Sequence, residues 1–178
     1  EAGGVSFLVS PTAFFQTNVE AAAMLAAQVL AAVPVENARV LDLYAGLGFF
    51  ALPLARRGHA VVAVEENPLA VADGEASAQF NRIGPSQCRF VRARAEEALD
   101  RCARRGEAFD TVVLDPPREG TTGEVVDLLR ADPSPARIVY VSCDPDALGR
   151  DLVRFLRPGA GTAYRVSAVI PIDMFPHT

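Results

Sequence analysis

The sequence predicts an α/β fold: a doubly wound, Rossmann-like and mostly parallel sheet with helices on both faces. From residue 39 onward, short β-branched and aliphatic runs alternate with helix-like segments, which is typical of parallel sheets. The strand runs are apolar almost throughout, as expected when both faces of a sheet are covered. A chain of 178 residues can bury one core. We therefore expect one domain over residues 1–178, in which residues 1–35 lead into a core at 36–178.

Each element is predicted from local signals. Residues 5–9 form an apolar run that predicts an opening strand, and Asn18 can cap a helix that ends near Pro34. Further strands are expected at residues 39–44, 60–65, 88–91, 109–114, 137–141 and 162–170. Helices are expected at residues 49–57, 68–81, 95–105, 122–130 and 145–156. Glycine or proline stops most of these helices, at Gly58, Gly84, Gly106 and Pro158.

Composition excludes several classes of protein. No apolar run reaches the ~18 residues of a membrane span, and the net charge of −5 disfavours a stand-alone nucleic-acid binder. The arginines between residues 89 and 105 are interpreted as a solvated strand end and helix face. Three scattered cysteines are too few for a disulfide scaffold or a cysteine-ligated metal site. We therefore expect a cytoplasmic protein without a metal.

A glycine-rich turn follows the first strand of the alternating part. Gly46 and Gly48 allow the backbone to turn tightly and approach a ligand. Glu65 ends the next strand, 19 residues after Gly46, where a carboxylate can bind both hydroxyls of a ribose. A nicotinamide-dependent oxidoreductase fits this pattern as well.

Three further features favour S-adenosyl-L-methionine as the cofactor. Asp42 lies inside the strand before the glycines, which suits a ligand ammonium better than a pyrophosphate. Asp115 begins an Asp-Pro-Pro turn after the fourth strand, a turn typical of enzymes that methylate bases. A cysteine, Cys143, follows the fifth strand. Together these features favour a methyltransferase over a dehydrogenase.

Cys143 is predicted at the start of a helix. Asp144 offers an N-cap oxygen, and Pro145 fits the first helical turn. The unpaired N–H groups of a helix start stabilise a thiolate, so Cys143 is a candidate nucleophile. The alternative is a buried cysteine that acts as a small hydrophobic residue.

The chain resembles the catalytic domain of the RNA 5-methyluridine methyltransferases, which act on transfer RNA or large-subunit (23S) ribosomal RNA. The matching segments lie in family order over nearly the whole chain, at residues 14–18, 41–48, 64–65, 114–120, 139–145 and 173–178. The resemblance implies an S-adenosyl-L-methionine-dependent enzyme with Cys143 as nucleophile. It also implies that four residues line the cofactor and target-base pocket: Gln16, Tyr44, Glu65 and Asp115.

The chemistry suggests roles for these residues. Asp115 can hydrogen-bond the base or polarise its ring, Gln16 can read an imide edge, and Phe15 can form a wall of the pocket. The partner is then an RNA with an unpaired or flipped uridine, and we expect a monomer that binds no membrane. An exocyclic-amine methyltransferase, which needs no cysteine, and a cofactor-binding module without catalysis remain as alternatives.

The resemblance also implies parts beyond these residues. Family members usually have an amino-terminal RNA-binding barrel, and some have an iron–sulfur cluster. The base that removes a proton from uracil is expected at a glutamate beyond Thr178. We expect the chain to be a fragment that ends before the last strand of the sheet.

Overall fold

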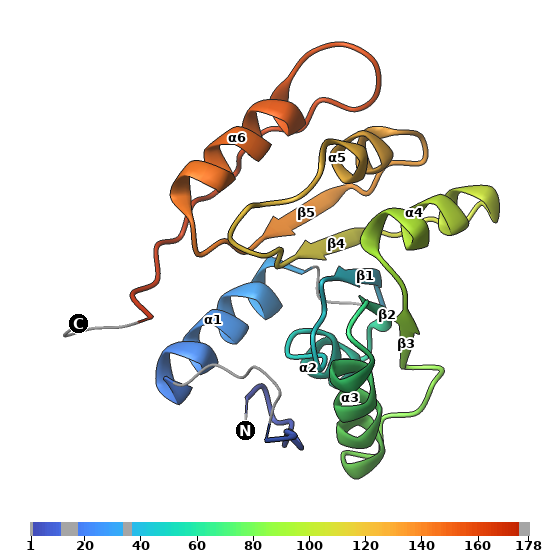
Figure 1. Cartoon of the computed structure of the whole chain (residues 1–178), viewed down its shortest axis with the longest axis vertical. Coiled ribbons are helices and arrows are strands. Elements are labelled where there is room, and N and C mark those ends of the chain that lie inside the picture. The colour runs from blue at the N-terminus through green and yellow to red at the C-terminus, as the bar shows by residue number, and fades with distance from the viewer. Residues whose placement is uncertain (1, 12–17, 34–36, 175–178) are drawn as a thin grey trace.

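In the computed structural model every described strand pair is parallel, in agreement with the mostly parallel sheet that we predicted. The structure describes residues 2–11, 18–33 and 37–174. Five strands pair in the order β3-β2-β1-β4-β5 (Figure 1). They are β1 (Arg39–Leu43), β2 (Ala60–Glu65), β3 (Cys88–Arg92), β4 (Thr111–Leu114) and β5 (Arg137–Tyr140). The strand order reverses between β1 and β4, which is where ligands bind in folds of this kind.

Within the described ranges, six helices cover the two faces of the sheet. They are α1 (Val19–Ala32), α2 (Ala51–Arg56), α3 (Pro68–Phe80), α4 (Ala95–Arg104), α5 (Gly123–Arg130) and α6 (Pro145–Leu156). Val40 of β1 belongs to a core cluster with residues of α1, α2 and α3. Leu41 and Leu43 of the same strand belong to a second cluster with residues of α4, α5 and α6. The alternation of side chains along β1 thus supplies both cores.

Side-chain caps fix the starts of four helices. Asn18 Oδ1 accepts from the N–H of Ala21 at 3.1 Å, and Asp144 Oδ1 accepts from the N–H of Ala147 at 2.8 Å. Both caps were expected from the sequence. Asn67 and Thr122 cap α3 and α5 in the same way. None of the helices in the described ranges is long and apolar enough to cross a membrane.

The opening segment is not the strand that we predicted over residues 5–9. Among the described residues, its only ladder contact is an isolated bridge between Ala2 and Val5. The N–H groups of residues 6, 8 and 10 instead donate to side chains spaced along α3 and at its C-cap: Asn81, Ser77 and Asp73. A four-residue step along a helix matches a two-residue step along an extended chain in length. The helix therefore satisfies the donors that a strand partner would have satisfied.

The strand predicted over residues 162–170 is also absent from the described structure. The N–H of Thr162 donates to Arg130 O, and that of Tyr164 donates to Phe155 O. Val169 is 72% exposed. β-branched residues favour a strand only where a neighbouring strand packs against them, and here the ends of α5 and α6 bind the segment instead.

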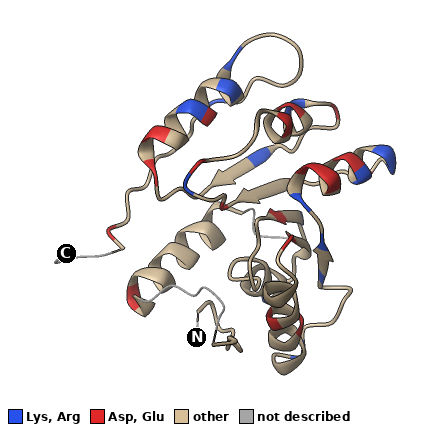
Figure 2. Ribbon diagram, viewed as in Figure 1, with Lys and Arg blue, Asp and Glu red and all other residues tan. Residues whose placement is uncertain are grey.

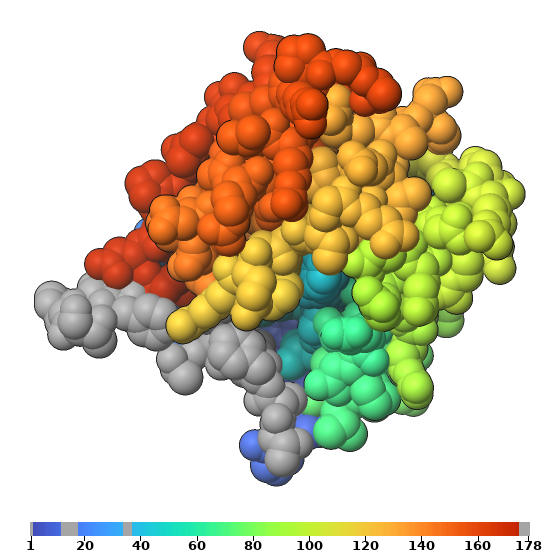
Figure 3. All heavy atoms as spheres, turned by 45° about the horizontal axis from the view of Figure 1, so that its top comes forward, coloured from blue at the N-terminus to red at the C-terminus, as the bar shows by residue number. Residues whose placement is uncertain are grey.

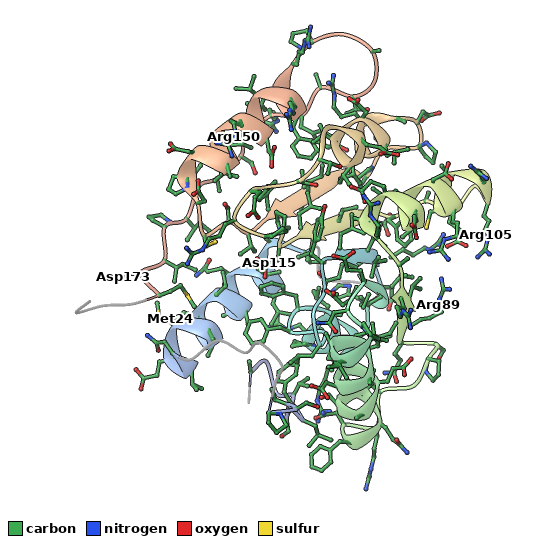
Figure 4. The ribbon with its side chains drawn as sticks, viewed as in Figure 1. Met24, Arg89, Arg105, Asp115, Arg150 and Asp173 are labelled. Atoms are coloured by element: carbon green, nitrogen blue, oxygen red, sulfur yellow. The ribbon has the colours of Figure 1, made fainter. Side chains whose placement is uncertain are left out.

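Charged residues of both signs interleave along α4 and α6 (Figure 2). Arg89 and Arg105, which point away from the body (Figure 4), both lie within 4 Å of the Glu107 carboxylate. Arg104 pairs with Asp100 one turn earlier on α4. This pairing fits the interpretation of the arginine-rich stretch as a solvated face.

Candidate functional site

A cavity of about 250 Å³ lies at the carboxyl ends of the central strands. It falls just below the range of about 300–1,000 Å³ that is usual for ligand pockets. Its lining residues are Tyr44, Val64, Glu65, Glu66, Ala93, Asp115 and Pro117. Figure 3 shows a hollow between the yellow segment after β4 and the green start of α3. The cavity thus occupies the place where the strand order reverses.

Tyr44, at the start of the glycine-rich loop, lines the cavity, whereas the predicted residues Gly46 and Gly48 are not among its lining residues. The N–H of Ala45 donates to Val64 O, which ties the loop to β2. Gly48 has φ +85°, and a Cβ there would lie 2.7 Å from the ring of Phe90. Tyr44 adopts φ +62° although it is not glycine. Strained backbone of this kind persists where surrounding contacts fix it.

Glu65 is held at the rim by two backbone donors. Its Oε2 accepts from the N–H of Gly46 at 2.9 Å, and its Oε1 accepts from the N–H of Asn67 at 2.8 Å. A carboxylate has about four acceptor sites, so each oxygen keeps one for a ligand. This pair of acceptor positions fits the two hydroxyls of a ribose, which would donate to it.

Asp42 does not line the cavity. Its side chain is fully buried, and neither carboxylate oxygen has a hydrogen-bond partner among the described residues. Burial raises the pKa of Asp42 well above its ordinary value, and the nearby Asp115 and Glu65 carboxylates raise it further. A direct contact with a ligand ammonium is not available to Asp42 in this arrangement.

Asp115 lines the cavity directly after β4, near the centre of the molecule in Figure 4. Burial raises its pKa to about 6. The next residue, Pro116, is buried, while Pro117 is exposed and lines the cavity. The Asp-Pro-Pro turn therefore presents a carboxyl group at the ligand-binding edge, ionised for the most part at pH 7.

Cys143 is the exposed thiol among three free cysteines. Burial raises the pKa of Cys88 to about 12 and also raises that of Cys102. Cys143 immediately precedes the α6 cap Asp144, whose N–H donates to Ser142 Oγ at 3.2 Å. The predicted strand–cysteine–helix geometry is therefore present.

Asp115 and Cys143 follow neighbouring parallel strands. Leu114, the last residue of β4, pairs in register with Tyr140, the last residue of β5. Asp115 comes one residue later and Cys143 three residues later. Both side chains therefore start from the same edge of the sheet.

Two segments of the family resemblance meet at the start of α1. Asn18 Nδ2 donates to Met174 O at 3.0 Å, and the neighbouring Asp173 is labelled near this helix in Figure 4. The predicted residues Phe15 and Gln16 lie outside the described residues.

Sequence reasoning missed Asp151, a buried carboxylate on α6. Its Oδ2 accepts from the hydroxyl of Tyr140 at 2.6 Å and from the N–H of Thr121 at 2.8 Å. The sequence did carry a signal for it. Ala147, Asp151 and Phe155 are spaced four residues apart, and these are the buried residues of α6. An acid at a position of the apolar stripe indicates a buried polar contact.

Comparison with known proteins identifies relatives over the whole chain. A family model described as tRNA (uracil-5-)-methyltransferase matches residues 5–178. An uncharacterized RNA methyltransferase of Geobacter sulfurreducens is 40% identical over 179 residues, covering 100% of this chain and 35% of the relative. The 23S rRNA (uracil(1939)-C(5))-methyltransferase RlmD of Edwardsiella ictaluri is 40% identical, covering 95% of this chain and 37% of the relative. The chain thus spans little more than a third of the length of these curated relatives.

Solved structures agree on the fold. The tRNA (uracil-54, C5)-methyltransferase of Pyrococcus abyssi, in complex with S-adenosyl-L-homocysteine, superposes with a TM-score of 0.83 at 34% identity. The match covers 98% of this chain and 40% of that one. A precorrin 8w decarboxylase of Methanobacterium thermoautotrophicum, 22% identical over 84% of this chain and 76% of its own, has a TM-score of 0.67. The second likeness supports the Rossmann-like fold alone.

Proposed function

Because the chain belongs to the tRNA (uracil-5-)-methyltransferase family, we propose that its protein methylates C5 of a uridine in RNA. The methyl group comes from S-adenosyl-L-methionine. Residues 1–178 then form the catalytic domain of a longer protein, which acts on RNA in the cytoplasm as a monomer. The observation that carries the proposal is the exposed Cys143 at a helix start, on the same sheet edge as Asp115 and the Glu65 cavity.

The described residues fit S-adenosyl-L-methionine. Glu65 offers two free acceptor positions for the ribose hydroxyls, and its orientation is fixed by two backbone N–H groups. Tyr44 and Pro117 line the same cavity. Gly46 and Gly48 let the backbone approach the amino-acid end of the ligand. When bound, this cofactor supplies an electrophilic methyl group on a sulfonium.

Cys143 makes uracil reactive toward that methyl group. Its thiolate adds to C6, and the electron pair of the C5–C6 double bond moves onto C5, C4 and O4 as an enolate. C5 then bonds to the methyl carbon as the carbon–sulfur bond breaks, with its electron pair left on sulfur. A base removes the C5 proton, the double bond returns, and the thiolate leaves C6. Cysteine suits the first step because its thiolate is strongly nucleophilic even at low abundance.

Asp115 and two residues before α1 are proposed to hold the base. Asp115 can accept a hydrogen bond from the uracil ring as a carboxylate or donate to O4 once protonated, and its raised pKa of about 6 brings both forms within reach. Gln16 is proposed to read the imide edge and Phe15 to pack on the ring. We propose that the base that removes the C5 proton is a glutamate beyond Thr178, as the family resemblance implies.

The relatives support RNA as the substrate without selecting one RNA. One relative is a 23S rRNA methyltransferase, and one structural neighbour is a tRNA methyltransferase. We propose a uridine of one of these two RNAs as the target.

Covalent trapping tests the proposal. The full-length protein is incubated with S-adenosyl-L-methionine and 5-fluorouridine RNA, in which fluorine blocks removal of the C5 substituent. We expect an adduct that survives denaturing electrophoresis and is absent in Cys143→Ala. Cys102→Ala, which removes a half-buried thiol, is the matched control and should form the adduct normally. If Cys143→Ala still methylates RNA, the exocyclic-amine alternative replaces this proposal.

A further inference from the structure

Asp151 connects the two segments that carry the proposed catalytic groups. Its Oδ2 accepts from the Thr121 N–H, in the loop that begins at Asp115, and from the hydroxyl of Tyr140, at the end of the strand that leads to Cys143. Asp151 itself lies on α6, whose N-terminus follows Cys143. One buried oxygen thus joins the loop after β4, the end of β5 and α6.

The network continues to the cofactor cavity. The hydroxyls of Thr121 and Tyr44 are hydrogen-bonded at 2.9 Å, and Tyr44 lines the cavity beside Asp115. Tyr44 also holds a left-handed backbone conformation, with φ +62°. Thr121 therefore links the glycine-rich loop to α6: its hydroxyl binds Tyr44, and its backbone N–H donates to Asp151.

The approach of the loop to Asp151 depends on Gly120. A Cβ at residue 120 would lie 2.5 Å from Asp151 Oδ2, and the φ of Gly120 is +85°. Any side chain here would push the loop away from α6. The Gly120 N–H donates to Pro117 O at 2.9 Å, so the Asp-Pro-Pro turn closes on itself before it meets α6.

The two hydrogen bonds to Asp151 are costly to break, because the carboxylate is buried and the Tyr140 hydroxyl stays protonated. Asp151 is 3% exposed, and a buried carboxylate that accepts two hydrogen bonds is costly to separate from its donors. Burial and the bond to Asp151 raise the pKa of Tyr140, so its hydroxyl remains a donor at neutral pH. Arg154, half exposed, approaches only the other oxygen, Oδ1, at 3.3 Å.

We propose that Asp151 is a positioning residue: it fixes the loop that presents Asp115 relative to the helix start that presents Cys143. The inference rests on the proposed function, because it assigns Asp151 a part in aligning uracil between these two groups. Asp151 is buried and is not among the residues that line the cavity, so the proposal gives it no contact with cofactor or base. Its removal should therefore slow formation of the covalent adduct while leaving RNA binding nearly unchanged.

The test measures adduct formation by the full-length protein with 5-fluorouridine RNA and S-adenosyl-L-methionine at saturation. A displacement of about 1 Å at a reacting centre costs up to about 100-fold in rate, so Asp151→Ala should form the adduct roughly 10- to 100-fold more slowly. The RNA concentration at half-maximal rate should change less than about threefold, since no RNA contact is removed. Asp151→Asn should restore most of the rate, because its amide oxygen can accept both bonds in place of Oδ2.

Two controls separate positioning from general loss of stability. Phe155→Leu removes packing from the same helix, at a residue 3% exposed that contacts the Tyr164 ring, and should keep the wild-type adduct rate. Hydrogen exchange at the Thr121 amide should accelerate in Asp151→Ala and not in Phe155→Leu, because only the first variant removes its acceptor. If Asp151→Ala fails to fold, Tyr140→Phe, which removes one hydroxyl, should still slow the adduct several-fold.

Each remaining outcome decides the question. If the wild-type protein forms the adduct and Asp151→Ala or Tyr140→Phe forms it at the same rate, the inference is overturned and the proposed function stands. Equal slowing by Phe155→Leu and Asp151→Ala also overturns it. A wild-type protein that forms no adduct overturns the proposed function and the inference with it.

Discussion

Replacing Glu65 by alanine is the sharpest test of the cofactor site. Both oxygens of Glu65 are held by backbone N–H groups, at 2.9 Å from Gly46 and 2.8 Å from Asn67. The carboxylate therefore meets the ribose in a fixed orientation, with one acceptor position left on each oxygen. Alanine removes this acceptor pair and also frees the start of the glycine-rich loop.

The magnitude follows from the hydrogen bonds that are lost. A hydrogen bond to a charged group contributes about 1.5–3 kcal/mol. The two ribose bonds are not additive, because water replaces part of the loss, so we take about 1.5–3 kcal/mol for the pair. This corresponds to roughly 10- to 150-fold weaker binding of S-adenosyl-L-homocysteine. Glu65→Gln should lose a similar amount, since its amide N–H₂ would face the N–H of Gly46 or Asn67.

Titration calorimetry of the full-length protein with S-adenosyl-L-homocysteine measures the effect. Glu97→Ala, at an exposed carboxylate on α4, is the matched control and should bind as the wild type does. A dissociation constant for Glu65→Ala within threefold of wild type would refute the ribose assignment. Tighter binding of a nicotinamide dinucleotide than of S-adenosyl-L-homocysteine would restore the oxidoreductase interpretation.

Two further predictions concern stability. The buried Arg130 donates to three backbone carbonyls around the end of α6, so Arg130→Met should lower the free energy of unfolding by about 2–4 kcal/mol. The exposed Arg137 makes one such bond, and Arg137→Met should cost less than about 1 kcal/mol in the same urea titration; equal shifts would contradict this reasoning. Because the folded pKa of Asp42 is raised above its ordinary 3.8, the unfolded state loses this proton first and stability falls as pH rises above about 4. Asp42→Asn should therefore flatten the fall in stability that begins above about pH 4, whose slope is at most about 1.4 kcal/mol per pH unit, and parallel stability curves for the two proteins would argue against a raised pKa of Asp42.

Features that depend on residues close together in the sequence could be predicted from it. The caps at Asn18 and Asp144 arise from side chains that bind N–H groups three residues away. The parallel sheet follows from alternating strands and helices, since right-handed crossovers leave few alternatives. The contact between Glu65 and the glycine-rich loop also follows, because the carboxyl ends of adjacent parallel strands meet at one edge.

The two strand predictions that were wrong concern segments whose hydrogen-bond partners lie far away in the sequence. Residues 5–9 and 162–170 both have strand-like composition, yet polar side chains of α3 bind the first and Arg130 anchors the second. β-propensity reports packing against a neighbouring strand, and local sequence does not reveal whether that strand exists.

The sequence by itself determined the fold class, the family and the order of the cofactor and cysteine motifs, because these reside in local patterns and fixed spacings. Only the tertiary structure decided what surrounds each carboxylate. Asp42 is enclosed in the core with no hydrogen-bond partner in the part of the chain that the structure describes, Asp115 lines the cavity, and Asp151 joins a loop, a strand and a helix. The physical reason is that burial and hydrogen bonding of an acid depend on groups that folding brings together from distant positions, and these groups set its charge and its role.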